Sequence, residues 1–351
     1  MENQEKPHKR RVRYSGTHPK RFSEKYKEHQ PEKYADVVEK VIRKGSTPAG
    51  MHISICVKEI LDFLQIQPGQ RGLDATLGYG GHTLEMLKCL KGEGHIYGLD
   101  VDPIESEKTK ERLKKQGFGE DILTVKLLNF RNIDQVAEEA GKFDFVLADL
   151  GVSSMQIDNP DRGFSYKTDG PLDLRMNPQK GISAAQRLKE VTQEELYGML
   201  LENADEPYAE EISKAVIRQR RIRPVETTTD LKQVIEQALS FIPEKERKEA
   251  VKKSCQRSFQ ALRIDVNSEF EVLYDFLEKL PQVLAPNGRA AILTFHSGED
   301  RLVKKSFKQF YKEGIYSDIS KNVIRPSQEE CARNSRARST KMRWAIRAQE
   351  I

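Results

Sequence analysis

The chain has 351 residues, a length that suggests one to three domains, and its 37% hydrophobic residues suffice for a real core despite a mean hydropathy of −0.68. The net charge is +5 at pH 7 and the isoelectric point is near 8.8, a mild basic excess that matters only where it is clustered. The 4 cysteines are widely spaced, and the chain shows neither a signal peptide nor an apolar run of about 18 residues. These features argue against a zinc site, a disulfide framework and a membrane span, and they predict a soluble cytoplasmic protein.

The first segment, residues 1–45, is dense in Lys, Arg, Glu and His and has almost no apolar periodicity before Val37. This composition is typical of a flexible basic extension that ends in a short helix. We therefore exclude it from the folded core.

Short apolar runs that end in Gly, Asp or Asn then alternate with helical patterns. Strands and helices that alternate at this spacing predict a parallel, doubly wound α/β sheet with right-handed crossovers. The expected strands are 72–78, 95–102, 122–129 and 143–151, and the expected helices between them include 82–90 and 104–115.

Strand signals stop after residue 152, and the chain to about residue 250 shows a turn-rich stretch followed by periodic helical patterns. The sheet pattern then resumes. We expect one domain formed by 46–152 and 251–351, interrupted by a mostly helical substrate-recognition domain at 153–250. The expected later elements are a helix at 267–284, a turn at 286–288, a strand at 289–297, a helix at 299–311 and a last strand at 342–348.

A glycine turn follows the first strand in the pattern Asp-x-x-x-Gly-x-Gly-Gly, from Asp74 to Gly81. Glycines let a ligand approach the backbone, and a helix N-terminus supplies free N–H groups, so the turn indicates a nucleotide-type cofactor rather than only a tight connection. The pattern differs from G-x-G-x-x-G and favours S-adenosylmethionine over a dinucleotide. Asp100, about 20 residues on, is placed to bind ribose hydroxyls. Asp102 is the alternative, although its position before Pro103 suits a helix cap.

Asp149 ends the fourth strand, at the edge where open α/β sheets place their chemistry. A carboxylate there can accept hydrogen bonds from a substrate amine or from the cofactor's ammonium group. The alternative role is a helix cap or a brace for the following loop.

Several blocks between about His52 and Arg347 together resemble the MraW/RsmH family. The resemblance implies a Rossmann-like class I methyltransferase that uses S-adenosylmethionine to methylate N4 of a cytosine in the decoding centre of 16S ribosomal RNA, with the small ribosomal subunit as partner; it also suggests a homodimer. The blocks are DATLGYGGHT, GLDVDP, NF, LADLGVSSMQIDNPDRGFSYKTDGPLDLRM, FQALRIDVNSE, APNGRAAILTFHSGEDRLVK and NSRARSTKMR. The cofactor contacts that it implies are Gly80, Gly81, His82, Asp100, Phe130, Asp149 and Gln156.

Departures from the family pattern flank the RNA side more than the cofactor side. The basic extension is longer, SCQRSFQALR replaces a different block, and Gly298 stands where Leu is common. Two other functions therefore stay open: a methyltransferase of the same fold that acts on another nucleotide, and a non-catalytic ribosome-assembly factor.

For the reaction, we expect Asp149, or a carbonyl of the loop from Asp149 to Ser153, to accept a hydrogen bond from N4 while a flipped base is held in a pocket. No metal site is expected. Candidate substrate-binding residues are Phe164, Tyr166, Asp173, Arg175, His296, Ser297 and Asp300.

Three Lys/Arg clusters are candidates for contact with RNA phosphates, although charge runs are more often solvated faces. If the first cluster binds RNA, deletion of 1–33 weakens RNA binding and its salt dependence but not cofactor affinity. The clusters are Lys9-Arg10-Arg11-Arg13, Arg218-Arg220-Arg221-Arg223 and Arg333-Arg336-Arg338-Lys341-Arg343.

Overall fold

The computed structural model describes residues 54–349. The chain divides into two units, Met1–His52 and Ile53–Ile351, and the description below concerns the second alone. The expected basic extension, its short helix and its Lys/Arg cluster lie outside the described residues. Among the described helices, none is long and apolar enough to cross a membrane.

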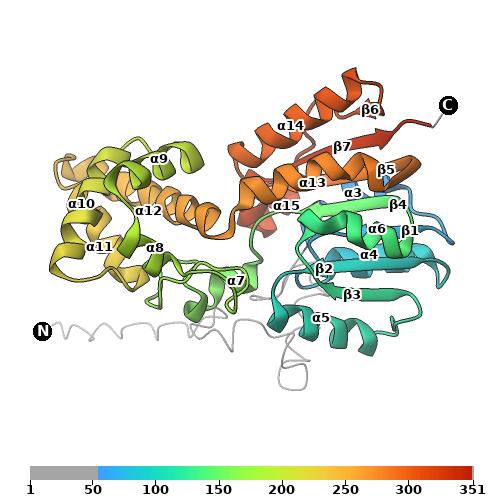
Figure 1. The fold of residues 1–351 in the computed structure, drawn as a ribbon, viewed down its shortest axis with the longest axis horizontal. Coiled ribbons are helices and arrows are strands. Elements are labelled where there is room, and N and C mark those ends of the chain that lie inside the picture. Colours follow the sequence, from blue (N-terminus) through green and yellow to red (C-terminus); the bar gives the residue numbers. More distant parts are fainter. Residues whose placement is uncertain (1–53, 350–351) are drawn as a thin grey trace, which may run out of the picture. The chain divides into compact units, whose positions relative to one another are not determined.

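A seven-stranded sheet forms the centre of the fold, with the strand order β3-β2-β1-β4-β5-β7-β6 (Figure 1). Neighbouring strands from β3 to β5 pair in parallel, and β7 is antiparallel to both β5 and β6. The doubly wound α/β sheet expected from the sequence is confirmed. The strands are β1 (Arg71–Asp74), β2 (His95–Asp100), β3 (Leu123–Leu127), β4 (Phe143–Asp149), β5 (Leu284–Thr294), β6 (Tyr316–Ile319) and β7 (Lys341–Arg347).

Helices cover both faces of the sheet because the central strands are apolar on both sides. One apolar cluster packs α6, α13 and α14 on one face, and another packs α3, α4 and α5 on the other. The helices are α3 (Val57–Leu64), α4 (Gly81–Leu90), α5 (Pro103–Lys115), α6 (Ile133–Ala140), α13 (Glu269–Val283) and α14 (Ser297–Lys312), with the short η2 (Phe130–Asn132) and η4 (Ser335–Ser339) and α15 (Gln328–Arg333) beside them.

Two strands depart from the expected pattern. The turn at 286–288 lies inside β5 as a bulge, because Phe143 pairs with Leu284 and Phe145 already pairs with Arg289. Asn287 adopts a φ of 62°, which makes room for the extra residues. The short strand β6 escaped prediction because only one of its four residues, Tyr316, is buried.

A third apolar cluster lies in the helical region that follows β4. It joins the inner faces of α8 to α11 and most of α12 with the loop that precedes them. Figure 1 shows these helices gathered around α12, which then leads to α13. Their bounds are α7 (Ser154–Asp158), η3 (Pro160–Arg162), α8 (Ala184–Glu190), α9 (Gln193–Ala204), α10 (Ala209–Ile222), α11 (Thr228–Ala238) and α12 (Glu244–Asn267).

The long helix α12 belongs to both regions of the chain. Its buried residues up to Leu262 pack in the helical cluster, Val266 packs against it, and the helix ends at Asn267. Ser268 then takes a left-handed conformation, with φ 50°, and α13 begins at Glu269 against the sheet. The helical packing thus extends beyond residue 250, and the end of α12 is placed beside the loop from β4.

Candidate functional site

The glycine turn after β1 is held against the end of β2. Gly78 and Gly80 have φ values of 48° and 77°, and α4 begins directly afterwards at Gly81. A side chain at Gly80 would not fit, because its Cβ would lie 2.7 Å from Cγ2 of Thr109. The backbone N–H of Gly78 donates to Oδ2 of Asp100 over 2.9 Å.

Asp100 is a nearly buried carboxylate at the end of β2. Its Oδ1 accepts from the backbone N–H of Asp102 over 2.8 Å. Burial raises the pKa of Asp100 to about 6, although hydrogen bonds from the backbone of Asp102 and Gly78 favour the charged form. Each carboxylate oxygen keeps a second lone pair, so Asp100 can still accept from a pair of hydroxyls.

Asp149 lies at the end of β4 and is fixed through its backbone. Its N–H donates to Oγ1 of Thr76 over 2.6 Å. Its Oδ2 lies 3.6 Å from Nδ1 of His82, and Nε2 of His82 donates to the carbonyl of Ile55 over 2.8 Å. His82, in the first turn of α4, therefore points one ring nitrogen at Asp149 and is oriented by the other.

The second oxygen of Asp149, Oδ1, is buried and has no hydrogen-bond partner among the described residues. Burial raises the pKa of Asp149 to about 6, His82 opposes that rise, and the charges of Asp74 and Glu299 add to it. A buried acceptor without a donor is costly unless a ligand supplies one. Oδ1 is therefore the position at this edge of the sheet where a ligand could donate a hydrogen bond.

Asp102 lies two residues beyond Asp100 and caps α5, as its position before Pro103 predicted. Its Oδ1 accepts from the backbone N–H groups of Ile104 and Glu105, over 3.0 and 3.3 Å. Its side chain is fully buried, with an exposed fraction of 0%. The other oxygen, Oδ2, faces the loop that follows β4.

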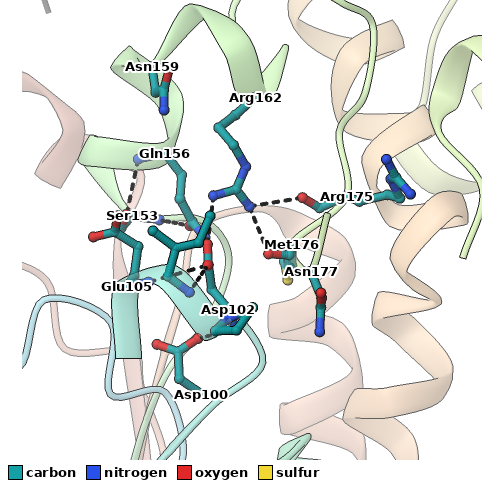
Figure 2. Close-up of polar contacts among 12 residues, drawn as sticks. Asp100, Asp102, Glu105, Ser153, Gln156, Asn159, Arg162, Arg175, Met176 and Asn177 are labelled. Atoms are coloured by element: carbon teal, nitrogen blue, oxygen red, sulfur yellow. Dashed lines mark hydrogen bonds and ion pairs between the residues drawn. The ribbon is translucent and has the colours of Figure 1, made fainter. Parts of the chain in front are cut away.

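Two side chains of that loop donate to Oδ2 of Asp102 (Figure 2). Nε2 of Gln156 lies 3.1 Å from it, and the guanidinium of Arg162 lies 2.6 Å from it. Gln156 also accepts from the backbone N–H of Ser153 in a capping box at the start of α7. Sequence reasoning missed Arg162, because its residue type alone does not distinguish a buried anchor from a surface charge.

Arg162 continues the network into the turn formed by Asp173–Met176. Its NH2 group donates to the carbonyls of Arg175 and Met176, over 3.1 and 2.7 Å. Asp173 and Arg175, both candidate substrate-binding residues, form a fork-shaped ion pair with contacts of 2.8 and 2.7 Å. The loop from β4 is thus tied directly to the carboxyl edge of the sheet.

The end of β5 carries a second polar group beside Asp149. Nε2 of His296 lies 3.2 Å from Oε1 of Glu299, a buried carboxylate whose other oxygen accepts from the N–H of Phe295 over 2.8 Å. Burial acts to raise the pKa of Glu299, but His296 and Arg263 outweigh it and leave the pKa below its usual value. This histidine therefore braces the strand end.

Gly298, at the start of α14, packs against an aromatic ring. A Cβ at this position would lie 2.6 Å from Cζ of Phe270 and 3.2 Å from Nδ1 of His296. Phe270 thus fills the space beside residue 298.

Asp300, a candidate substrate-binding residue, is engaged within the protein. It forms ion pairs with Arg343 over 2.7 Å and with Lys341 over 3.2 Å, both on β7. Burial acts to raise the pKa of Asp300, but these two cations keep it below its usual value. Its neighbour Ser297, also a candidate, is the exposed first residue of α14.

Three aromatic candidates pack against apolar clusters. Phe130 follows β3 and meets Phe276 edge to face, with ring centroids 5.2 Å apart. Phe164 is buried in the helical cluster, and Tyr166 meets Phe259 edge to face at 5.8 Å. The structure thus brings His82, Asp100, Asp149, Gln156 and the end of β5 to one edge of the sheet, whereas Phe164 and Tyr166 lie in the packing of the helical region.

The two described basic clusters are largely used in internal contacts. In the first, NH1 of Arg220 donates to the carbonyls of Leu188 and Val191, and Arg223 pairs with Asp230 over 2.6 Å. Arg218 and Arg221 are exposed and have no carboxylate partner among residues 54–349.

In the second cluster, Arg336 pairs with Asp158 over 2.8 Å and Arg333 with Glu329 over 2.5 Å. Lys341 and Arg343 are the partners of Asp300 described above. Only Arg338 of this cluster is exposed and lacks a carboxylate partner in the described part of the chain.

The chain is similar to known proteins along nearly its whole length. The family model described as the MraW methylase family matches residues 49–348. Ribosomal RNA small subunit methyltransferase H 1 of Lachnoclostridium phytofermentans is 74% identical over 99% of this chain and 95% of its own length. The protein of the same name from Agathobacter rectalis is 68% identical over 99% of this chain and all of its own length, 100%. A solved rRNA methylase from Streptococcus thermophilus covers 85% of this chain and 99% of its own at 12% identity, with a TM-score of 0.39, too low to add to these matches.

Proposed function

The chain belongs to the MraW methylase family, and from that premise we propose that it transfers the methyl group of S-adenosylmethionine to N4 of a cytosine in the decoding centre of small-subunit ribosomal RNA. Support for the ribosomal substrate comes from the two relatives with 74% and 68% identity. Support for N4 of cytosine comes from the block DLGVSSMQIDNPDRGFS and its continuation DGPLDLRM. The homodimer suggested by the same resemblance stays a prediction.

The carboxyl edge of the sheet fits S-adenosylmethionine. The turn at Gly80 and Gly81 leads into the N-terminus of α4, where backbone N–H groups are free to donate. Asp100 offers two carboxylate oxygens for ribose hydroxyls. The unpartnered Oδ1 of Asp149 is an acceptor for an amine or ammonium donor. We assign Phe130 to the wall of the adenine pocket and His82 and Gln156 to the same site.

The exocyclic amine of cytosine is a poor nucleophile, because its lone pair is delocalised into the ring, so the enzyme must hold it in line with the methyl group. When bound, S-adenosylmethionine supplies that methyl group on a positively charged sulfur. Asp149 accepts a hydrogen bond from N4 and takes the proton that N4 loses as its bond to the methyl carbon forms and the carbon–sulfur bond breaks. A carbonyl of the loop Asp149–Ser153 is the alternative acceptor.

A raised pKa suits Asp149 to this role. Since burial moves the pKa to about 6, the carboxylate is charged at neutral pH, yet it is a better proton acceptor than an ordinary aspartate. Alignment of the amine and the methyl group supplies much of the reduction in the activation barrier, on the order of 7 to 11 kcal/mol in favourable cases.

The methyl-accepting base must leave its stack to reach this edge. We assign its contacts to Asp173 and Arg175 on the loop from β4 and to His296 and Ser297 at the end of β5. The packing of Phe164 and Tyr166 in the helical cluster makes them supports of that loop in this proposal.

The observation that carries the proposal is the buried, unpartnered Oδ1 of Asp149 at the edge where the cofactor turn, β4 and β5 meet. The test is mass spectrometry of ribosomal RNA nucleosides from cells that lack the protein, with the wild-type gene and an Asp149→Asn gene returned separately. We expect N4-methylated cytosine to disappear, to return with the wild type and to stay absent with the variant. Retention of every methylated cytosine would overturn the assignment.

A further inference from the structure

The turn Asp173–Met176 contains a strained residue. Leu174 has a φ of 64° and is fully buried, although a left-handed conformation is unfavourable for a branched apolar side chain. Such strain costs about 1 kcal/mol or more and persists only where the surroundings hold it, which occurs most often at ligand-binding sites. The contacts that hold Leu174 in this conformation therefore indicate which residues keep the turn in place.

Arg162 holds the turn from the sheet side. Its carbonyl accepts from the N–H of Leu174 over 3.2 Å, and its guanidinium donates to the carbonyls of the next two residues. The same guanidinium donates to Asp102, and the two side chains are exposed by only 10% and 0%. Because one group binds a carboxylate and two carbonyls at once, the planar fork of Arg is required, and the single nitrogen of Lys cannot replace it.

Asn267 holds the turn from the helical side. Its Nδ2 donates to the carbonyls of Leu174 and Arg263, each over 2.8 Å, and its Oδ1 accepts from the N–H of Met176 over 2.8 Å. The side-chain amide is therefore satisfied by contacts to α12 and to the turn. The strained residue is thus clamped between the end of α12 and the cap of α5.

The clamp fixes two polar side chains that are still accessible. Asp173 and Arg175 flank Leu174 and are about one-fifth exposed, at 20% and 21%. Figure 2 shows the guanidinium of Arg175 directed away from Arg162, while its carbonyl faces Arg162. The backbone of Arg175 is thus tied through Arg162 to Asp102, two residues beyond Asp100. Its side chain, paired with Asp173 and donating to the carbonyl of Gly181 over 3.1 Å, keeps one-fifth of its surface exposed.

We propose that Arg162 and Asn267 are positioning residues for the methyl-accepting RNA: they hold the strained turn Asp173–Met176 so that the Asp173–Arg175 pair receives the RNA at a fixed place relative to the cofactor edge. This inference rests on the proposed function. It assigns a catalytic consequence to two residues that touch neither the cofactor nor the reacting atoms.

The test compares Arg162→Lys and Asn267→Asp with matched controls. Asn267→Asp keeps the size of the side chain but turns an acceptor toward two carbonyls. The controls are Arg289→Lys, which alters an Arg bonded to the carbonyl of Phe63 at the opposite edge of the sheet, and Asn203→Asp, which alters an Asn bonded to the carbonyl of Ala261 on α12. Each purified full-length variant is tested for thermal unfolding, S-adenosylmethionine affinity, and KM and kcat for small-subunit RNA.

We expect both clamp variants to lower kcat/KM for RNA by about 10- to 100-fold, because a misplacement of 1 Å has effects of that order. Affinity for S-adenosylmethionine should stay within about twofold, since Asp100 and Asp149 are unchanged. Both controls should keep wild-type kinetics even where their melting temperatures fall.

Wild-type KM and kcat in either clamp variant, measured where that variant is folded, would refute the inference. If Arg162→Lys does not fold, Asn267→Asp decides alone, because it acts on the same turn from the other side. A wild-type protein that binds S-adenosylmethionine but methylates no small-subunit RNA would refute the proposed function instead. That result would also refute the inference, because the inference rests on the proposed function.

Discussion

Two pairs of partly or fully buried carboxylates lie along the same edge of the sheet, and their surroundings differ. Asp100 and Asp149, at the ends of β2 and β4, have no Lys or Arg partner among the described residues, and burial raises the pKa of each to about 6. Asp300 and Glu299, in the first turn of α14 after β5, are also desolvated by burial, but nearby cationic groups leave their pKa values below the usual range.

The difference separates groups that hold the fold together from groups that, in the function we propose, are kept for a ligand. The charge of Asp300 is neutralised by Lys341 and Arg343, so it joins β7 to the start of α14. Asp149 keeps one buried oxygen without a donor, at a cost in stability. Sequence position alone does not distinguish the two, since both are acidic residues near strand ends, and only the partners reveal the role.

The sharpest test of this contrast is Asp149→Asn. We expect methyl transfer to fall by about 100-fold or more, the size typical for loss of a group that acts in the transition state. Stability at pH 8 should rise by about 2 kcal/mol, because an amide carries no buried charge. Single-turnover methylation and urea unfolding measure the two effects; normal cofactor binding with a near wild-type rate would contradict the role of Asp149.

Asp300→Asn should have the opposite effects, with a larger loss of stability and a smaller loss of methyl transfer. Arg343 is buried, so loss of its partner is expected to cost about 3 kcal/mol at pH 7, with methyl transfer changed less than by Asp149→Asn. The folded-state pKa of Asp300 is lowered, so its stabilisation is present above the unfolded pKa and is lost as the pH falls through the folded value. Urea unfolding at pH 7 and in acid would reveal this, and an unchanged midpoint at pH 7 would show that the ion pairs do not stabilise the fold.

The pH dependence of the wild type offers a finer distinction. The raised pKa values of Asp100 and Asp149 make their contribution to stability greatest below about pH 4 and lost as the pH rises through about 6. If Asp149 must be charged to act, kcat/KM should rise with pH through about 6. Rate profiles across pH 5–8 measure this dependence. A flat profile would show that the ionisation of Asp149 does not control the rate of methyl transfer.

The smallest expected effect concerns the basic clusters. Arg218 and Arg221 are exposed without carboxylate partners, whereas Arg336 is paired with Asp158. If the unpaired arginines each meet a phosphate, replacing both with Ala should lower the salt slope of RNA binding by roughly 1.5 to 2. RNA titrations at several salt concentrations measure the slope, with Arg220→Ala as the comparison, because Arg220 binds carbonyls of the protein.

The sheet could be predicted because its strands are apolar runs bounded by polar residues, and the strands around Asp74, Asp100 and Asp149 were located to within a few residues. Strand β6 and the bulge at Asn287 could not, because they depend on pairing with distant strands.

The same limit applies to the site. The glycine turn and the strand-end aspartates follow from local pattern. The contacts of Arg162 with Asp102 and of Asn267 with Leu174 span 60 and 93 residues, so local pattern contains no sign of them.

The packing of Gly298 against Phe270 restricts which residues position 298 can accept. The ring occupies space that a side chain at 298 would need, with only 2.6 Å between Cζ and a Cβ. The two positions therefore share one volume, and a larger residue at 298 requires the ring of Phe270 to turn away or to be replaced by a smaller side chain.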